Sequence, residues 1–203
     1  VGADVESLGV VPTPAVAYLV RKYNADAGVV ISASHNPMEF NGIKIFAGTG
    51  YKLPDDVEEE IEAHIDDKCA GIPLATGDGV GRVTCRIDGI KDYVEHLYES
   101  IGGDLSGLNV CIDCANGAAS ATAPDLFRAL PLQADFIHTE PDGVNINNGC
   151  GSTHLESLAR GVVSGGYDLG IAFDGDADRC LLVDEQGNTI DGDKVMALSL
   201  IHI

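Results

Sequence analysis

The chain has 203 residues, of which 45% are hydrophobic, and its 32 acidic and 12 basic side chains give a formal net charge of −20. That charge excludes general nucleic-acid binding, which needs a basic face, although a metal ion, backbone N–H groups or local Lys and Arg can still hold an anion. No apolar run is long enough to span a membrane and no signal peptide is recognisable, so we expect a cytoplasmic protein without a membrane partner.

The first part of the chain predicts two strands around a polar loop, with a helix on either side. Val10 and Val11 are interpreted as the end of a strand, and the prolines that follow open a short helix over residues 15–23. A glycine-rich stretch at 71–81 then marks a domain boundary before Arg86. The other predicted elements are strands at 27–31 and 43–46, the loop 32–41 between them, and a helix whose apolar face is Leu53, Val57, Ile61 and Ile65.

The second part of the chain alternates helices and strands. Thr153 and Glu156 have capping-box spacing for one of the helices, which runs through Arg160. The fold class predicted is α/β, with two consecutive mixed α/β domains, each a sheet with flanking helices. The other predicted elements are a helix from Ile87 to Ile101, strands at 108–113, 134–137, 169–173 and 180–183, a helix at 120–130, and a last helix near Asp193.

The six cysteines follow no zinc-ribbon spacing. Cys111 and Cys114 form a C-x-x-C, but Cys111 lies in an apolar, strand-like run, which is typical of a buried thiol. Because no secretory signal is present, we expect reduced thiols rather than disulfides.

The stretch Phe-Asp-Gly-Asp-Ala-Asp-Arg at 173–179 places three carboxylates at alternate positions. Apolar runs precede and follow it, so Asp174, Asp176 and Asp178 are predicted to lie on a tight loop at the end of a strand. Three carboxylates this close repel one another, and a hard divalent cation removes that cost by taking their oxygens as ligands. A plain solvated turn needs neither three acids nor the arginine that closes the loop, Arg179. The pattern therefore favours Mg²⁺ and phosphate.

Two other kinds of metal protein share part of this pattern. The calcium-loop spacing matches at the three aspartates and at Glu185, but its sixth position should be glycine and is Arg179, and the flanks are strands rather than helices. We reject that interpretation. Aspartyl-nucleophile phosphatases carry a D-x-D pair after an apolar strand, as Asp174 and Asp176 do here. That alternative, with the phosphoryl group on Asp174, stays open.

A second polar motif, Ser-Ala-Ser-His-Asn-Pro at 32–37, follows the predicted strand at 27–31. Serine is a weak nucleophile unless a base activates it or it already carries a phosphoester. His35 follows Ser34 directly, but neighbours on a strand point apart and no G-x-S-x-G elbow is present, so a serine-hydrolase relay is not implied. A phosphoryl group on Ser34 would add a charge of roughly −1.5 to −2 and would need a cation. On spacing alone, a polar turn explains the motif equally well.

Taken together, the motif at 32–37, the Asn-Gly-Ile-Lys at 41–44 and the acidic loop resemble the α-D-phosphohexomutase superfamily, with supporting stretches at 12–19, 113–118, 141–147 and 170–173. The resemblance implies a protein of four domains. We expect both ends of this chain to be cut, because it starts at Val1 without Met and stops at Ile203 soon after a helix begins. Residues 1–85 would be the later part of the first domain, 86–190 the second domain, and 191–203 the start of the third.

The same resemblance implies how phosphate and metal are held. Ser34 would be the phosphoserine. Mg²⁺ would be bound by one phosphoryl oxygen on Ser34 together with Asp174, Asp176 and Asp178, where it would act as a Lewis acid as the phosphoryl group leaves.

Three further residues match positions with a role in the superfamily. Lys44 and His35 are the candidates for general acid/base, and Arg179 is expected to contact the phosphoserine or its loop. The branch of the superfamily that the chain resembles interconverts glucosamine 6-phosphate and glucosamine 1-phosphate through a 1,6-bisphosphate, an isomerase reaction that feeds amino-sugar nucleotide and cell-wall synthesis. The expected partners are therefore the hexosamine phosphate and the bisphosphate, and the oligomeric state is left open.

Several alternatives remain open on the sequence. The hexose could be mannose or glucose instead of glucosamine, because the sugar- and phosphate-binding loops of the superfamily lie beyond Ile203. The aspartyl phosphatase is a second alternative, and a non-catalytic fragment that binds Mg²⁺ or a sugar phosphate is a third. We expect the isolated 203 residues to be inactive.

Overall fold

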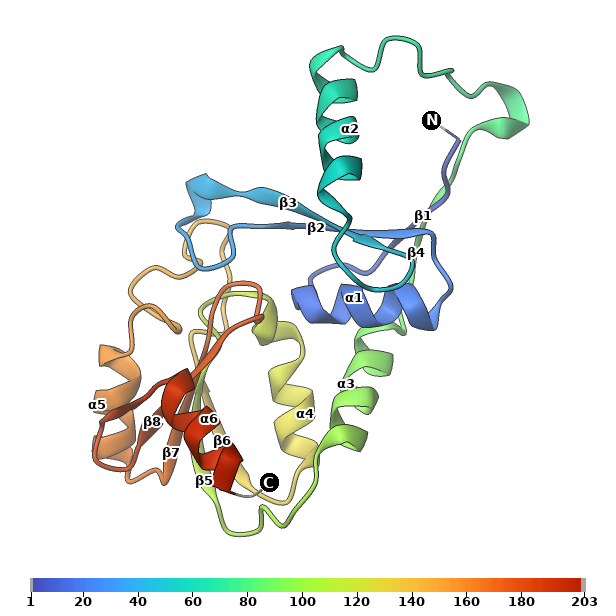
Figure 1. Ribbon diagram of the computed structural model, residues 1–203. Helices are drawn as coiled ribbons and strands as arrows, with labels where there is room; N and C mark the ends of the chain where they lie inside the picture. Colours follow the sequence, from blue (N-terminus) through green and yellow to red (C-terminus); the bar gives the residue numbers. More distant parts are fainter. Residues whose placement is uncertain (1, 202–203) are drawn as a thin grey trace.

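The computed structural model describes residues 2–201, with the side chain of Ile201 excepted. The parallel pair β1–β4 and the antiparallel ribbon β2–β3 are its first sheets, and Val29 lies opposite Ile45 in the ribbon. Helix α1 lies along this ribbon (Figure 1). The elements of this first part are β1 (Val5–Ser7), α1 (Thr13–Lys22), β2 (Ala27–Ser32), a 3-10 turn (Met38–Phe40), β3 (Gly42–Ala47), α2 (Asp55–Asp66), a 3-10 turn (Gly77–Gly79) and β4 (Val83–Cys85).

The core of the first part forms where α1 meets the β2–β3 ribbon and helix α3 (Gly89–Ser100). Apolar residues at helical spacing give α1 its buried face, and Tyr93 of α3 completes the cluster. Helix α2 matches the apolar period predicted between residues 53 and 65, but none of its residues is buried. The buried residues of this core are Val11, Ala15, Val16, Leu19, Val20, Val30 and Tyr93.

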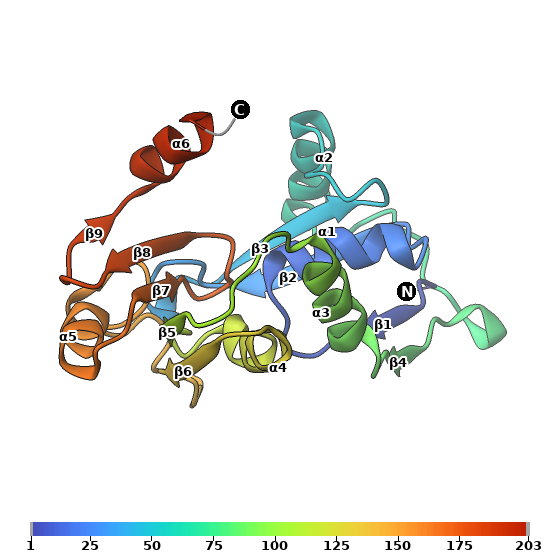
Figure 2. The same cartoon turned by 90° about the horizontal axis from the view of Figure 1, so that it is seen from below.

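The second part is a five-stranded sheet with the order β6-β5-β7-β8-β9. β5 pairs in parallel with β6 and β7, and β8 and β9 continue the sheet antiparallel. Figure 2 shows α6 beyond β9, away from the sheet. The elements are β5 (Asn109–Asp113), a 3-10 turn (Ala118–Ala121), α4 (Ala123–Ala129), β6 (Gln133–Ile137), α5 (Glu156–Gly165), β7 (Leu169–Phe173), β8 (Cys180–Asp184), β9 (Thr189–Ile190) and α6 (Gly192–Ile201).

Side chains alternate along β5 and belong to two separate cores, one on each face of this sheet. Val110 and Ile112 pack with α4, whereas Cys111 packs with Leu158 and Val162 of α5. Both faces of the sheet are therefore covered, and the turns at the ends of its strands are left free to carry polar groups. The predicted α/β class is confirmed.

Two local predictions were wrong, and one predicted helix starts later than expected. No strand ends at Val10 and Val11, because the strand is β1, which ends at Ser7 and is held by its pairing with the distant β4. The capping box does not form, since the N-cap of α5 is Leu155 and no side chain caps this helix. The helix predicted over 120–130 is α-helical only from Ala123. Proline lacks an N–H and is tolerated only in the first turn, so Pro124 sets that start.

Most of the other predicted elements are confirmed, with ends that shift by at most two residues. The strands β2, β3, β5, β6, β7 and β8 lie where the apolar runs predict them, and α3 is shorter than its apolar period because Ile87 is exposed and Ile101 only caps the helix. None of the helices within residues 2–201 is long and apolar enough to cross a membrane.

Candidate functional site

The acidic loop is the turn of the β7–β8 hairpin. Asp174 and Asp176 are almost completely buried, while the side chain of Asp178 is 33% exposed. Each of the three offers a carboxylate oxygen within 4.8 Å of the others, as the sequence predicted. The loop is held by its own backbone: the N–H of Ala177 donates to the carbonyl oxygen of Asp174, and the N–H of Arg179 donates to Asp174 Oδ1 at 3.1 Å.

The pKa values of the two buried aspartates shift in opposite directions. Burial raises the pKa of Asp174 to about 6, and the charges of Asp176 and Asp178 add to that effect. Burial acts on Asp176 too, but hydrogen bonds from Lys44 and Thr13 outweigh it and hold the pKa of Asp176 below its usual value. Asp176 therefore keeps its negative charge to lower pH than Asp174 does.

Two oxygens of this loop fit a bound cation. Asp174 Oδ2 and Asp176 Oδ1 are shielded from solvent, and neither has a hydrogen-bond partner within the described residues. A buried carboxylate oxygen without a partner costs on the order of 1–3 kcal/mol or more, and a hard cation that prefers oxygen ligands would remove that cost. The donor set, three carboxylates with no nitrogen or sulfur, suits Mg²⁺.

Lys44 reaches the loop from β3. Its Nζ lies 2.6 Å from Asp176 Oδ2 and 3.0 Å from Asp178 Oδ2. Partial burial by itself would lower the pKa of Lys44, but the two hydrogen bonds outweigh this and raise it. Lys44 is therefore a protonated side chain directly beside the candidate metal ligands.

Ser34 lies in the loop after β2, and the fold carries this loop to the acidic loop. Its backbone is left-handed, with φ at 53°, and its N–H donates to Ser32 Oγ at 2.9 Å. A hydrogen bond from the Ser34 side chain helps to lower the pKa of Asp176. A Cβ on Gly175 would lie 2.5 Å from the carbonyl oxygen of Ser34, so only glycine allows the two loops to approach this closely. The predicted serine and aspartate motifs thus meet.

The other two predicted site residues are placed less tightly. His35 Nδ1 is shielded from solvent and lacks a hydrogen-bond partner within residues 2–201. The side chain of Arg179 is 56% exposed and its Nε lies 3.9 Å from Asp178 Oδ1. A contact between Arg179 and a phosphorylated Ser34 stays a prediction.

Two residues of the site were not predicted from the sequence. Thr13 donates its backbone N–H to the carbonyl oxygen of Asp176 and its hydroxyl to Asp176 Oδ2. Asn147 donates through Nδ2 to the carbonyl oxygens of Ser34 and Asn36, both at 2.8 Å. Both residues lie in stretches that carry the family resemblance, but no spacing rule links residue 13 or 147 to the loops they hold.

A pocket opens beside this cluster. Its volume is about 470 Å³, and Thr13, Lys44 and Asp178 line it together with apolar residues of α1 and β3. A phosphorylated ligand in this pocket would therefore meet the lysine and the acidic loop.

Comparison with known proteins agrees with this fold. Residues 1–70 match the model for phosphoglucomutase/phosphomannomutase alpha/beta/alpha domain I, and residues 91–187 match the model for domain II. The chain belongs to the phosphoglucomutase/phosphomannomutase family, within the α-D-phosphohexomutase superfamily.

The curated relatives bear the name of one enzyme within this family. The phosphoglucosamine mutases of Clostridium acetobutylicum and Acetivibrio thermocellus are each 57% identical over 198 residues, covering 98% of this chain but 44% of the relative. The chain thus spans less than half the length of the curated relatives it matches. The crystal structure of a phosphoglucomutase/phosphomannomutase family protein from Burkholderia thailandensis has a TM-score of 0.80 at 26% identity, covering 99% of this chain and 45% of that one.

A more distant solved structure shares the fold. N-acetylphosphoglucosamine mutase of Aspergillus fumigatus, in complex with GlcNAc-6P and magnesium, has a TM-score of 0.52 at 20% identity and covers 92% of this chain and 50% of that one.

Proposed function

We propose that this chain carries the phosphoserine loop and the metal loop of a phosphoglucosamine mutase, which interconverts glucosamine 6-phosphate and glucosamine 1-phosphate. The observation that carries the proposal is the close approach of the Ser34 loop to the acidic loop, where a Cβ on Gly175 would lie 2.5 Å from the carbonyl oxygen of Ser34. The choice of glucosamine rests on the curated relatives, which bear this name at 52–57% identity. A mannose or glucose phosphate is the alternative that an assay must exclude.

We propose Mg²⁺ as the metal, held by Asp174, Asp176 and Asp178 with an oxygen of the phosphoryl group on Ser34. The support is the all-oxygen donor set and the two buried carboxylate oxygens without partners. When bound, Mg²⁺ would supply positive charge that stabilises the phosphoryl group during transfer.

The residues of the chain account for both transfers. In the first, the bond between phosphorus and Ser34 Oγ breaks and a bond to O1 of glucosamine 6-phosphate forms, while the O1 proton passes to a base and Ser34 leaves as a hydroxyl. In the second, the 1,6-bisphosphate has turned around, the bond between phosphorus and O6 breaks and a bond to Ser34 Oγ forms, while the proton of the serine hydroxyl passes to a base and O6 gains a proton. The products are glucosamine 1-phosphate and the phosphoserine with which the cycle began.

Lys44 and His35 are the proposed proton carriers. The hydrogen bonds to Asp176 and Asp178 outweigh burial, raise the pKa of Lys44 and keep it protonated, and we propose Lys44 as the acid once the substrate has replaced these contacts. His35 has a solvent-shielded ring nitrogen free to accept one. Arg179, at the end of the acidic loop, is proposed to hold the phosphoserine by its positive charge.

The domain limits are also a proposal. We infer that residues 1–85 form the later part of the first domain, 86–190 the second, and 191–203 the start of a third. The return of β4 to pair with β1 supports a limit after residue 85, and the separation of α6 from the sheet supports one near 191 (Figure 2).

The test is phosphopeptide mapping of the full-length protein and turnover of its Ser34→Ala variant, with Ser164→Ala, an exposed serine of α5, as the matched control. We expect acid-stable phosphate on Ser34, and Ser34→Ala to lose at least a thousandfold in turnover of glucosamine 6-phosphate while Ser164→Ala keeps it. An acyl phosphate on Asp174, with no phosphate on Ser34, would contradict the proposed mutase and favour the aspartyl phosphatase. Faster turnover of mannose or glucose phosphate would correct the sugar only.

A further inference from the structure

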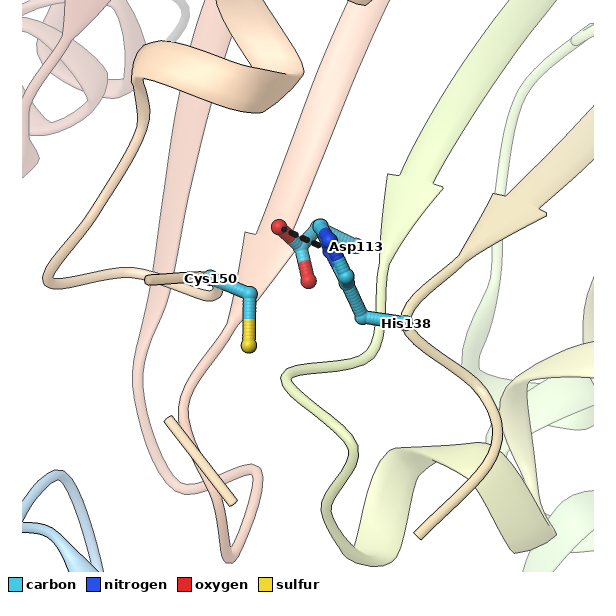
Figure 3. A group of neighbouring side chains, drawn as sticks. All are labelled: Asp113, His138 and Cys150. Atoms are coloured by element: carbon cyan, nitrogen blue, oxygen red, sulfur yellow. Dashed lines mark ion pairs between the residues drawn. The ribbon is translucent and has the colours of Figure 1, made fainter. Parts of the chain in front are cut away.

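A second cluster of ligand-type side chains lies outside the acidic loop. Asp113 is the last residue of β5, His138 directly follows β6, and Cys150 lies in the loop that leads to α5 (Figure 3). Each offers one ligand atom, and the three atoms lie within 4.8 Å of one another. The parallel pairing of β5 and β6 explains why the first two meet, since parallel strands end at the same edge of a sheet.

The cluster is buried but can be reached from solvent on one side. Asp113 and Cys150 are 0% exposed, whereas the side chain of His138 is 31% exposed. An ion could therefore enter past the imidazole and then be enclosed by the carboxylate and the sulfur.

The imidazole of His138 lies close to a carboxylate oxygen of Asp113. His138 Nδ1 lies 3.1 Å from Asp113 Oδ2, yet within the described residues this shielded nitrogen has no hydrogen-bond partner. A hydrogen on Nδ1 or a cation near both atoms would make this contact favourable. A proton would satisfy these two atoms alone, but a metal ion would also use the sulfur beside them.

The surroundings hold the ligands in place. The backbone N–H of Ala115 donates to Asp113 Oδ1 at 2.8 Å, and that of Gly151 donates to Oδ2 at 2.9 Å, so the carboxylate cannot rotate freely. Asn116 Nδ2 lies 3.9 Å from Cys150 Sγ and can donate to a thiolate. Such outer contacts orient metal ligands and are a usual part of metal sites.

We propose that Asp113, His138 and Cys150 bind one Zn²⁺ ion, with a fourth position open to water on the side of His138. A set of one sulfur, one nitrogen and one oxygen suits Zn²⁺ and not Mg²⁺, which takes oxygen ligands. A tetrahedral Zn²⁺ would hold its ligand atoms roughly 3.3–3.6 Å apart. The Asp113–His138 pair, at 3.1 Å, is already near this spacing, and Cys150 Sγ lies within 4.8 Å of both atoms.

The ion would join three segments that the acidic loop depends on. It would tie the ends of β5 and β6 to the loop 139–155, which contains Asn147. Because Asn147 holds the backbone of Ser34 and donates its N–H to the carbonyl oxygen of Ala115, the site would stiffen the platform under the serine loop.

The test uses Co²⁺ as a spectroscopic probe on the full chain, under reducing conditions and with saturating Mg²⁺ to fill the acidic loop. The variants are Cys150→Ser and His138→Gln, and Cys85→Ser, an exposed cysteine of β4, is the control. We expect one Co²⁺ per chain with a thiolate-to-Co²⁺ charge-transfer band in the wild type and in Cys85→Ser. Zn²⁺ should displace the Co²⁺ and abolish the band.

We expect Cys150→Ser to lose the band and His138→Gln to bind Co²⁺ at least tenfold more weakly. Because Cys150 is buried, circular dichroism first establishes that Cys150→Ser is folded. If Cys150→Ser is not folded, the Co²⁺ affinity of His138→Gln, a variant at a half-buried position, decides whether the proposal holds. No band in the wild type, a band that persists in folded Cys150→Ser, or unchanged affinity in His138→Gln would each overturn the proposal and leave a protonated His138–Asp113 pair.

Discussion

At the scale of single residues, Thr13 and Asn147 set the position of Ser34 relative to the acidic loop. Thr13 makes two hydrogen bonds to Asp176, and Asn147 makes one each to Ser34 and Asn36. Ser34 and Asn147 both have positive φ angles, which cost roughly 1–2 kcal/mol for a residue with a side chain. The hydrogen bonds offset this strain, and the strained loop is thereby presented to the aspartates.

The prediction at this scale concerns the substitution of Lys44. Its ammonium group already neutralises Asp176 and Asp178, so it competes with a metal ion for the charge of the same carboxylates. We expect Lys44→Met to bind Mg²⁺ several-fold more tightly while turnover of the sugar phosphate falls, because the proton carrier is gone. Isothermal titration with Mg²⁺ measures the first effect and a turnover assay the second.

Lys91→Met, which removes a charge from an exposed position on α3, is the control and should change neither quantity. Mg²⁺ affinity that is unchanged or weaker in Lys44→Met would show that the lysine does not compete with the ion.

At the scale of elements, α5 packs directly on β7 because one strand position carries no side chain. A Cβ on Gly170 would lie 2.7 Å from Val162 Cγ2 and 3.0 Å from Leu158 Cγ. Both of those side chains are fully buried and cannot move aside easily. The close approach of helix and strand orients the β7–β8 hairpin, and with it the acidic loop.

Gly170→Ala and Gly161→Ala make a matched pair within this packing. We expect Gly170→Ala to lower the free energy of unfolding by about 1–3 kcal/mol, because the added methyl group overlaps buried side chains. Gly161 lies inside α5 with no atom near its missing Cβ, so Gly161→Ala should raise the free energy of unfolding by about 0.5–1 kcal/mol. Urea unfolding measures both, and equal changes would contradict this account of the packing.

At the scale of the whole molecule, α3 joins the two parts. Tyr93 of α3 belongs to the core around α1, and α3 also contacts α4 of the second part. Tyr23, just after α1, donates its hydroxyl to Asp92 Oδ2 at 2.6 Å, and Lys22 Nζ lies 3.3 Å from Asp92 Oδ1. Burial and this hydrogen bond raise the pKa of Tyr23 to about 12, and the hydrogen bond from Tyr23 lowers the pKa of Asp92.

Asp92→Asn tests this joint. The pKa of Asp92 is lower in the folded than in the unfolded chain, so its contribution is present above about pH 4 and is lost as the pH falls through the folded value. We expect Asp92→Asn to lower the free energy of unfolding by about 1 kcal/mol at pH 7, with the difference from wild type vanishing near pH 2. Thermal unfolding across this pH range measures it.

The exposed Asp78→Asn should show no such pH-dependent difference. A gap between Asp92→Asn and wild type that stays constant down to pH 2 would mean that the charge of Asp92 does not stabilise the joint.

The sequence alone determined the local structure around both motifs. The strands before Ser34 and Asp174 follow from apolar runs, and the tight acidic loop follows from three acids between two strands. These features depend on neighbours along the chain, so periodicity and turn chemistry are enough to predict them. The family resemblance added the pairing of the two motifs.

Only the tertiary structure decided which distant segments meet. The first strand ends at Ser7, before Val10, because it pairs with the distant β4. The N-cap position of α5 is occupied by Leu155 rather than Thr153. The hydrogen bonds of Thr13 and Asn147, and the cluster of Asp113, His138 and Cys150, also join segments far apart along the chain. The physical reason is that such contacts follow from how sheets and helices pack, and no local pattern of residues encodes that packing.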